Sequence, residues 1–231
     1  MKEPLLLLPG MMCDARVFAH QINVFSAERP VMVAPLIERA SFEYLVEDLL
    51  ASAPPQFALA GLSMGGIAAM EIMRQAPERV TRLALMDTNP LADPAERIAI
   101  RDAQIETVLN GGLRSVIRDE MKPNYLSPRS DSSSILALCM AMAESMGVAA
   151  FVDQSRALQQ RRDQCDTLRK IRIPTLILCG EDDALCPVER HELMHQLVEG
   201  SQLTVVPGAG HLPQLEQAEC VTQVLVQWLN D

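Results

Sequence analysis

The sequence predicts an α/β protein with a mostly parallel sheet of about six strands, flanked by helices and interrupted by a helical insertion. Short apolar runs alternate with helical patterns up to Asp87, and the same alternation resumes after Arg169. Between Pro94 and Arg169 the patterns are helical and no strand-like run is visible. Strands that are apolar throughout and joined by helices are typical of a parallel sheet covered on both faces.

The first half of the chain supplies four of the expected strands, each a short apolar run bounded by proline, glycine or a polar turn. These runs cover residues 5–8, 31–34, 57–60 and 80–86. Serine is a good helix cap, and leucines and valines at helical spacing after Ser41 predict a helix to about Ser52. A further helix is expected from the glycine-rich turn after the third run to about Gln75, before Pro77.

The middle of the chain predicts the helical insertion, and the last part returns to the alternating pattern. Helical patterns cover residues 95–109, 113–121, 132–146 and 148–164, with glycines and prolines between them. Two more strands are expected at 175–179 and 203–206, with a helix at 187–198 and a last helix carrying Val221, Val224, Leu225 and Trp228. We therefore expect a core in two parts, residues 1–90 and 171–231, around a helical cap insertion at 91–170.

Composition and charge limit the functions that the chain can have. Its 231 residues suffice for one domain with a full core. The net charge of −10 repels phosphate backbones and anionic membranes, so we expect neither a nucleic-acid nor a membrane partner. No apolar run approaches the roughly 20 residues of a membrane span, and Met1–Gly10 lacks the length of a secretory signal. The six scattered cysteines then predict reduced thiols in a cytoplasmic protein.

The segment from Gly61 to Gly65 reads Gly-Leu-Ser-Met-Gly and matches the pattern G-x-S-x-G. An expected strand precedes it and an expected helix follows it, which is the context of a nucleophile elbow. In such a sharp turn, side chains two residues to either side of the serine would collide, so glycine is needed there. The turn places the Ser63 hydroxyl at a helix N-terminus, where developing negative charge is favoured. The alternative is a glycine-rich turn whose serine only caps the helix.

A serine hydroxyl needs a base to become a good nucleophile, and the chain has four histidines. His211 follows the last strand in a loop at the carboxyl edge of the expected sheet, where open α/β proteins place their sites. His20 is expected in a helix. The segment His191-Glu192-Leu193-Met194-His195 has the spacing H-E-x-x-H, in which two histidines could bind a metal, but on this polar helix face we expect both to be solvent-exposed. The alternative for His211 is a structural hydrogen bond within its loop.

A catalytic histidine in turn needs an acid to hold its tautomer. The fifth expected strand is followed by Gly180-Glu181-Asp182-Asp183, again at the carboxyl edge. Three consecutive acids are more often a solvated turn. The pattern alone therefore leaves the identity of the acid open.

Taken together, these motifs resemble the α/β-hydrolase superfamily, in its single-domain esterase-like branch with a helical cap. The resemblance covers nearly the whole chain and rests on LLLLPGM, GLSMGG, LALMDT, PTLILCGEDDALCP and GAGHLPQLEQ, in the family order nucleophile, acid, base. It implies Asp183 as the acid, because the family carries it on the fourth residue of G-x-x-D. Asp182 is the first alternative, and Asp87 the second, although a structural role suits Asp87 better.

The resemblance also implies two backbone N–H groups for an oxyanion hole, those of Met64 and Met11. The loop that carries Met11 departs from the family, which has His-Gly where this chain has Pro9-Gly10. Proline fixes φ and has no N–H, so a different loop conformation is open. The chain begins almost at its first strand, so we expect the family's N-terminal β-hairpin to be missing.

The function implied is a serine hydrolase that cleaves a small or medium acyl ester through an acyl-enzyme intermediate, without metal or organic cofactor. His211 would take the Ser63 proton and later pass it to the leaving group, and Asp183 would orient His211. A small molecule with an apolar acyl group is the expected partner, because methionines suit adaptable apolar pockets. The methionines expected there are Met64, Met121, Met140, Met142 and Met146.

Other functions use the same residues. Thioesterase, lactonase and C–C bond hydrolase activities need the same three side chains, and a ligand-binding protein on this scaffold needs none of the chemistry. A serine at position 63 disfavours the relatives that attack with a carboxylate. Arg97, Arg101 and Arg114 of the insertion could meet a substrate carboxylate, although exposure to solvent is the simpler expectation.

Overall fold

The structure of the protein, a computed structural model, describes residues 2–128 and 133–230. Its centre is a sheet of six strands in the order β2-β1-β3-β4-β5-β6, and every neighbouring pair is parallel. The strands are β1 (Leu5–Leu8), β2 (Val31–Val33), β3 (Phe57–Leu62), β4 (Val80–Met86), β5 (Thr175–Gly180) and β6 (Gln202–Val206). This confirms the predicted sheet. The strand order reverses direction between β1 and β3, and open α/β sheets bind ligands at such a point.

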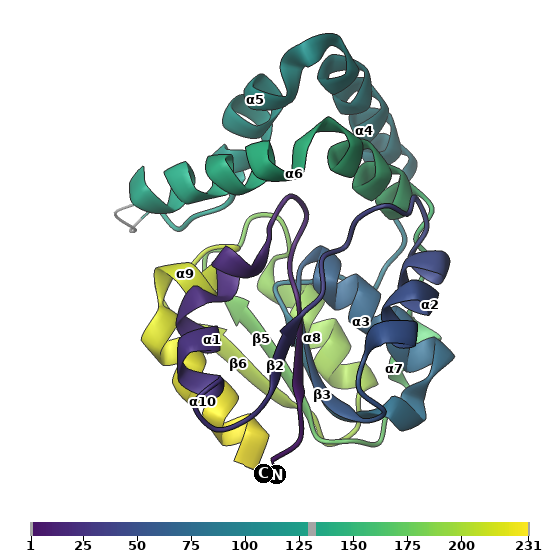
Figure 1. Cartoon of the computed structure of the whole chain (residues 1–231), viewed down its shortest axis with the longest axis vertical. Coiled ribbons are helices and arrows are strands. Elements are labelled where there is room, and N and C mark those ends of the chain that lie inside the picture. Colours follow the sequence, from purple (N-terminus) through teal and green to yellow (C-terminus); the bar gives the residue numbers. More distant parts are fainter. Residues whose placement is uncertain (1, 129–132, 231) are drawn as a thin grey trace.

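Helices cover both faces of this sheet (Figure 1). One face carries α1 (Ala19–Phe25) and α10 (Ala218–Asn230), and the other carries α2 (Phe42–Ser52), α3 (Met64–Gln75), α7 (Cys165–Leu168) and α8 (Val188–Leu197). Shorter pieces are α9 (Pro213–Glu216) and single 3₁₀ turns at Ala15–Phe18, Pro77–Arg79 and Lys122–Asn124. Fully apolar strands such as β1 and β3 follow from this cover on both sides.

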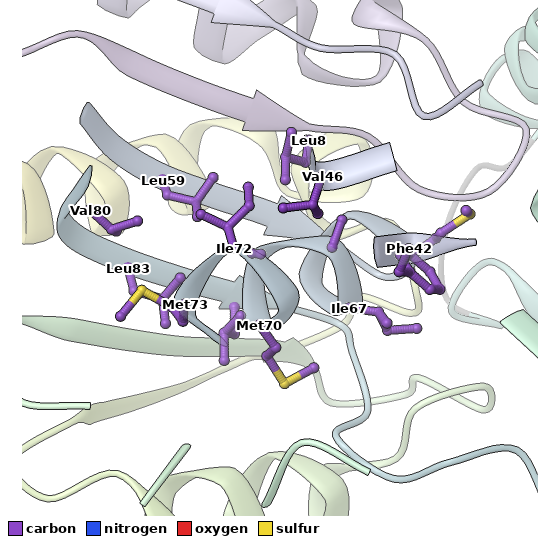
Figure 2. Close-up of a cluster of buried hydrophobic side chains, with 14 of the residues drawn as sticks. Leu8, Phe42, Val46, Leu59, Ile67, Met70, Ile72, Met73, Val80 and Leu83 are labelled. Carbon is purple, nitrogen blue, oxygen red and sulfur yellow. The ribbon is translucent and has the colours of Figure 1, made fainter. Parts of the chain in front are cut away.

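The helix that follows the G-x-S-x-G turn is among the most buried of the described helices. All residues of α3 from Met64 to Met73 are buried, and Figure 2 shows several of them packed with β3, β4 and α2. Close-packed interiors resist displacement. The N-terminus of α3, and with it Ser63, is therefore held in place by the core.

Between β4 and β5 the chain leaves the sheet and forms helices above its carboxyl edge (Figure 1). They are α4 (Ala95–Thr107), α5 (Leu113–Ser115) and α6 (Ser133–Gln159), with wide π-type turns at Val108–Gly112 and Val116–Met121. A separate apolar cluster that includes Met12, Ile105 and Phe151 joins these helices to the loop after β1. The expected helical insertion is thus present, and we keep the name cap segment for residues 91–170, whose bounds stay a prediction.

The longest helix differs from the expected pair of helices at 132–146 and 148–164. The expected start at Ser132 lies outside the described residues, and α6 ends at Gln159 instead of Gln164. Gly147 breaks its regular path with φ 78° and ψ −175°, so the predicted division at this glycine is present as a bend.

Helix α6 is long and apolar enough to cross a membrane, with a mean hydropathy of 2.0 in its most apolar window. Only 28% of that window is buried. The bend at Gly147 leaves two halves, each shorter than the roughly 20 residues of a straight span. Both halves bury side chains against the protein, among them Met142 and Phe151. The expectation of no membrane partner stays a prediction.

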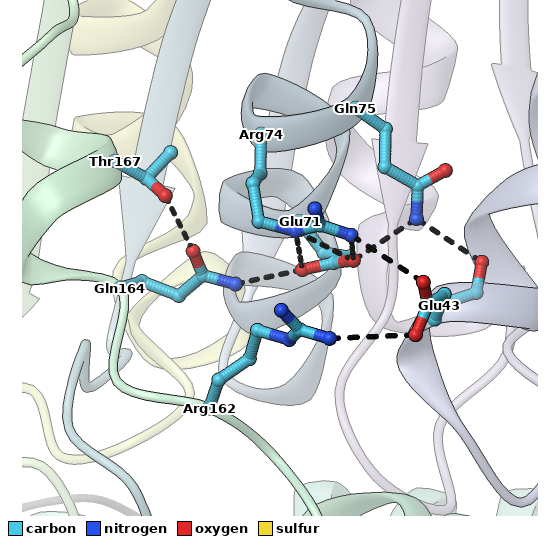
Figure 3. A network of polar contacts seen from close by, with 7 residues as sticks. All are labelled: Glu43, Glu71, Arg74, Gln75, Arg162, Gln164 and Thr167. Carbon is cyan, nitrogen blue, oxygen red and sulfur yellow. Dashed lines mark hydrogen bonds and ion pairs between the residues drawn. The ribbon is translucent and has the colours of Figure 1, made fainter.

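A polar network ties the end of the cap segment back to the core (Figure 3). The buried carboxylate of Glu71 accepts from Arg74 Nη2 at 2.6 Å, from Gln75 Nε2 at 2.9 Å and from Gln164 Nε2 at 2.8 Å. Burial acts to raise the pKa of Glu71, but these donors outweigh it and lower the pKa overall. A buried charge satisfied in this way fixes the chain where it re-enters the core.

Candidate active site

Ser63 lies at the end of β3 in a backbone conformation that is rare for a residue with a side chain, with φ 51° and ψ −112°. The flanking glycines are required by space. A Cβ on Gly61 would lie 2.3 Å from the Gly65 carbonyl oxygen, and a Cβ on Gly65 would lie 2.0 Å from that of Leu8. The Ser63 N–H donates to Met86 O on the adjacent strand at 2.8 Å. The turn is therefore the strained elbow that the motif predicts.

Ser63, His211 and Asp183 follow three different strands and are joined by two hydrogen bonds, with His211 in the middle. His211 Nε2 lies 2.9 Å from Ser63 Oγ, and His211 Nδ1 lies 2.8 Å from Asp183 Oδ2. His211 and Asp183 are 5% and 4% exposed, so water competes little for these bonds. With a proton on Nδ1 donated to the carboxylate, Nε2 is free to accept one from the hydroxyl.

The two alternative acids make other contacts. Asp182 Oδ2 accepts from Ser127 Oγ at 2.5 Å, and Asp87 Oδ1 accepts from the Gly180 N–H at 2.9 Å. The Asp183 Oδ1 atom accepts from the backbone N–H groups of Leu185 and Cys186 at 2.8 and 3.0 Å. These two bonds turn the other oxygen of Asp183 toward His211. Of the three candidate acids, Asp183 is the one bonded to the imidazole.

Asp87 and Asp183 form a buried pair with opposite pKa directions. Burial, followed by the negative charge of Asp183, raises the pKa of Asp87 well above its ordinary value. Burial also acts on Asp183, but His211 and the two backbone donors outweigh it and lower the pKa of Asp183. The two opposite directions favour the negative charge of the pair on Asp183, next to the imidazole.

Met64 and Met11 line the same cavity as Ser63, and each has a backbone N–H. Met64 is the first residue of α3, so its N–H has no partner within the helix. In the part of the chain that the structure describes, the Met11 N–H also has no recorded acceptor. The loop that carries Met11 passes so close that a Cβ on Gly10 would lie 3.5 Å from Ser63 Cβ. These are the two groups that sequence analysis expects in an oxyanion hole.

The loop after β1 is held from the cap segment, in spite of Pro9. The Met12 N–H donates to Gln154 Oε1 at 2.9 Å, and the amide nitrogen of Gln154 donates to Leu36 O at 2.8 Å. Met12 has a positive φ of 54°, and the Cys13 N–H closes a turn onto Gly10 O at 3.1 Å. The buried side chain of Gln154 in α6 therefore positions the loop after β1. These hydrogen bonds do not involve Pro9, which has no N–H.

The loop that carries His211 is fixed by contacts with three neighbouring segments. The His211 N–H donates to Tyr125 O of the cap segment at 2.7 Å, and the Gly210 N–H donates to Glu216 Oε1 at 2.8 Å. The loop after β5 lies directly against it, because a Cβ on Gly180 would be 2.0 Å from Gly210 O. The imidazole and its acid are therefore set by backbone packing.

A cavity of about 390 Å³ lies over these residues, between the sheet edge and the cap segment. Ser63, His211, Met11 and Met64 all line it. Its apolar lining includes Ile67, Tyr125, Leu158, Leu185 and Leu212. This volume is within the range of pockets that hold small molecules.

Comparison with known proteins places this geometry in a family. The model of the alpha/beta hydrolase family matches residues 5–223. The chain belongs to the alpha/beta hydrolase family. A solved esterase from Thermogutta terrifontis, with malate bound, has 28% identity and a TM-score of 0.91, covering 100% of this chain and 90% of its own.

Two curated relatives are similar to this chain over most of its length. A Pseudomonas putida protein named dihydrolipoyllysine-residue acetyltransferase component of acetoin cleaving system is 25% identical over 98% of this chain. The match spans only 63% of that relative's length. A pimeloyl-[acyl-carrier protein] methyl ester esterase from Neisseria meningitidis is 25% identical over 80% of this chain and 74% of its own.

The structure buries one of the two α8 histidines that are expected to be exposed. His191 is 0% exposed, so the expected solvent exposure is wrong. Its Nε2 accepts from the Thr88 N–H at 3.0 Å, and its Nδ1 lies 3.3 Å from Pro187 O. Burial lowers the pKa of His191 to about 4, so the ring is neutral and structural. His195 and His20 are exposed, and His20 lies in α1 as predicted.

Both nitrogens of His191 are occupied, so the histidine pair of α8 offers no metal site. A different group of potential ligand atoms, from Asp183, Cys186 and His211, lies within 4.8 Å. There the imidazole and carboxylate are bonded to each other and to Ser63. Burial, followed by the charge of Asp183, raises the pKa of the Cys186 thiol well above its usual value. A protonated thiol beside a hydrogen-bonded pair does not favour metal binding.

The cap segment lines the hydrolase cavity differently from what the sequence predicts. Met64 and Met121 line it, but Met140, Met142 and Met146 are absent from its lining. The last three pack in the second and third apolar clusters. The methionine-rich cavity is therefore only partly realised.

Arginines line the cavity more than expected. Arg101 is 8% exposed, which contradicts the expected exposure, and Arg97 is exposed but lines the cavity. Arg114 is exposed and pairs with Glu144 outside the cavity. Sequence reasoning missed Arg161, which pairs with Asp93 at 2.8 Å. No spacing in the sequence signals this pair, because the fold alone brings its two members together.

Proposed function

We propose that this hydrolase cleaves small or medium acyl esters through an acyl-enzyme intermediate on Ser63. The observation that carries the proposal is the continuous set of hydrogen bonds from Asp183 through His211 to Ser63, under a cavity of about 390 Å³. The esterase names of the Thermogutta and Neisseria relatives support the same class of reaction.

In the first half-reaction, Ser63 Oγ attacks the ester carbonyl carbon while His211 Nε2 takes the hydroxyl proton. The carbonyl oxygen becomes an oxyanion, which accepts from the N–H groups of Met64 and Met11. Each such donor contributes about 2.7–4 kcal/mol to catalysis in related chemistry. The carbon–oxygen bond to the alcohol then breaks, and the alcohol leaves with the proton from His211.

In the second half-reaction, water takes the place of the alcohol. His211 Nε2 accepts a proton from this water, whose oxygen attacks the acyl carbon. The bond to Ser63 Oγ breaks, the proton returns to the serine, and the carboxylic acid is released. Asp183 stays ionised throughout and stabilises the imidazolium that forms in each half, in keeping with its lowered pKa. No step requires a metal or an organic cofactor.

The proposal is tested by hydrolysis of p-nitrophenyl acetate and butyrate by the wild type and by Ser63→Ala. We expect kcat to fall by about 10⁶ in the variant, since removal of the nucleophile removes the covalent route. Ser26→Ala, at an exposed serine after α1 and away from the cavity lining, is the matched control and keeps wild-type rates. Comparable turnover by Ser63→Ala and the wild type would refute the mechanism.

Thioesters, lactones and carbon–carbon bonds are the remaining substrates for the same three side chains. A series of esters and thioesters of increasing acyl length, compared by kcat/KM, separates them. A non-catalytic ligand-binding protein would hydrolyse none of the series while remaining folded.

A further inference from the structure

The cavity above Ser63 carries more positive than negative charge. Its lining holds the arginines Arg97, Arg101, Arg161 and Arg190 and the carboxylates Asp93 and Glu120. This excess lies in a chain whose net charge is −10. A cavity with an excess of one sign concentrates ligands of the opposite sign.

The centre of this charge is a buried cluster of one carboxylate and two guanidinium groups. Asp93 Oδ2 accepts from Arg101 Nε at 2.7 Å, and Asp93 Oδ1 pairs with Arg161 Nη2 at 2.8 Å. The side chains of Asp93, Arg101 and Arg161 are 3%, 10% and 8% exposed. One carboxylate therefore faces two guanidinium groups in a site largely shielded from solvent. Burying a charge without a partner of opposite sign costs free energy.

Two features of the arginines that line the cavity favour an anion there. Arg161 Nε is buried and has no hydrogen-bond acceptor in the described part of the chain, so a guanidinium donor is unused. Arg97 and Arg190 line the same cavity, and within residues 2–128 and 133–230 neither side chain forms an ion pair. Guanidinium N–H donors without a protein acceptor match the oxygens of a carboxylate.

The cluster adjoins the reacting atoms. Arg101 Nη1 lies 3.8 Å from Met11 Sδ, in the loop that supplies the expected oxyanion donor. The charges of Arg161 and Arg97 both act on Cys186, whose sulfur lies within 4.8 Å of ligand atoms of His211 and Asp183. An anion bound at Arg161 would therefore sit in the same cavity as Ser63 and His211.

We propose that the ester substrate carries a carboxylate that binds Arg161, with Arg97 and Arg190 completing the subsite. This inference rests on the proposed function and makes it narrower: the substrate is a half-ester of a short dicarboxylic acid or an ester of similar charge. It replaces the purely apolar acyl group that the sequence predicts. Phosphate offers the same kind of oxygen, so the test includes it.

The first arm of the test measures specificity. The kcat/KM values for monoethyl adipate and for uncharged ethyl hexanoate are compared in the wild type, Arg161→Gln and Arg97→Ala. We expect the wild type to prefer the anionic ester at least tenfold and Arg161→Gln to lower this ratio about tenfold. Because both esters are measured on the same protein, the ratio of the two kcat/KM values does not depend on the fraction of active protein. Arg97→Ala, at an exposed residue without an ion pair, lowers the ratio in a protein that folds normally.

Arg114→Gln is the matched control, because Arg114 is a cap-segment arginine outside the cavity, and it leaves the ratio unchanged. A wild-type ratio near one, or a ratio unaffected by both Arg161→Gln and Arg97→Ala, would overturn the proposal.

The second arm measures binding without chemistry. Adipate and inorganic phosphate are titrated calorimetrically into Ser63→Ala protein, with and without Arg161→Gln. We expect adipate to bind at one site and Arg161→Gln to weaken it at least tenfold. Absence of adipate binding, or tighter binding of phosphate, would overturn the carboxylate assignment. If the proposed hydrolase activity were wrong, neither ester would be cleaved but adipate would still bind, so the two failures are distinguishable.

Discussion

The substitution Asp183→Asn tests the geometry of the hydrogen-bonded residues in detail. Asp183 Oδ1 accepts from two backbone N–H groups, at 2.8 Å from Leu185 and 3.0 Å from Cys186. The asparagine side chain keeps its carbonyl oxygen at these donors and therefore turns its NH₂ group toward His211 Nδ1. A donor at that position favours the tautomer with the proton on Nε2, which cannot accept the Ser63 proton.

The loss follows from this change of tautomer. We expect kcat to fall by about 10⁴, which is about 5.5 kcal/mol of transition-state stabilisation. The assay is hydrolysis of p-nitrophenyl butyrate, with thermal unfolding to show that the variant is folded. Asp87→Asn is the matched comparison, because Asp87 accepts from the Gly180 N–H and makes no hydrogen bond to His211, and it should cost less than about tenfold. Asp183→Asn with more than a tenth of wild-type kcat, or an equal loss in Asp87→Asn, would refute the reasoning.

Two further predictions concern the elbow and a buried histidine. Gly65→Ala places a Cβ 2.0 Å from Leu8 O, so we expect an inactive protein that melts several degrees lower than the wild type. Gly10→Ala is the control in the same melting experiment: its Cβ would lie 3.5 Å from Ser63 Cβ, and this variant should fold normally. An active, stable Gly65→Ala would contradict the packing of the elbow. The pKa of His191 is lowered to about 4, so the unfolded chain binds a proton that the folded one does not, and stability falls as pH drops from 6.5 through about 4. The total loss is about 3 kcal/mol, and urea unfolding at pH 7 and pH 5 should show a smaller decline in His191→Gln; parallel declines would contradict this.

The strands and the elbow could be predicted because their signals are local. The apolar run at residues 57–60 is ended by Gly61 and followed by a helical pattern, and this local pattern is enough to predict a strand. Position along the chain then places Ser63 and His211 at one edge, since parallel strands end at the same side of a sheet. Only the family resemblance distinguishes Asp183 among the three acids in the sequence, and in the structure Asp183 is hydrogen-bonded to His211.

The remaining features could not be predicted because they depend on contacts between distant segments. His191 lies on a helix with mostly polar neighbours, so no local signal indicates its burial. In the structure its Nε2 accepts a hydrogen bond from the Thr88 N–H, which belongs to a distant segment. Arg101 of α4 is buried against Asp93 in the loop before this helix, and Asp93 in turn pairs with Arg161 from the far end of the cap segment. The methionines of α6 face two clusters, and the direction of each depends on the bend at Gly147.

Covalent labelling with a fluorophosphonate probe, mapped by mass spectrometry of peptides, tests the central proposal most directly. The probe reacts only with a serine whose hydroxyl is activated by a neighbouring base. We expect one probe per chain, on Ser63, with no labelling of Ser63→Ala and strongly slowed labelling of His211→Gln. Folded wild-type protein that stays unlabelled, or that carries the probe on another serine, would contradict the proposal that His211 activates Ser63.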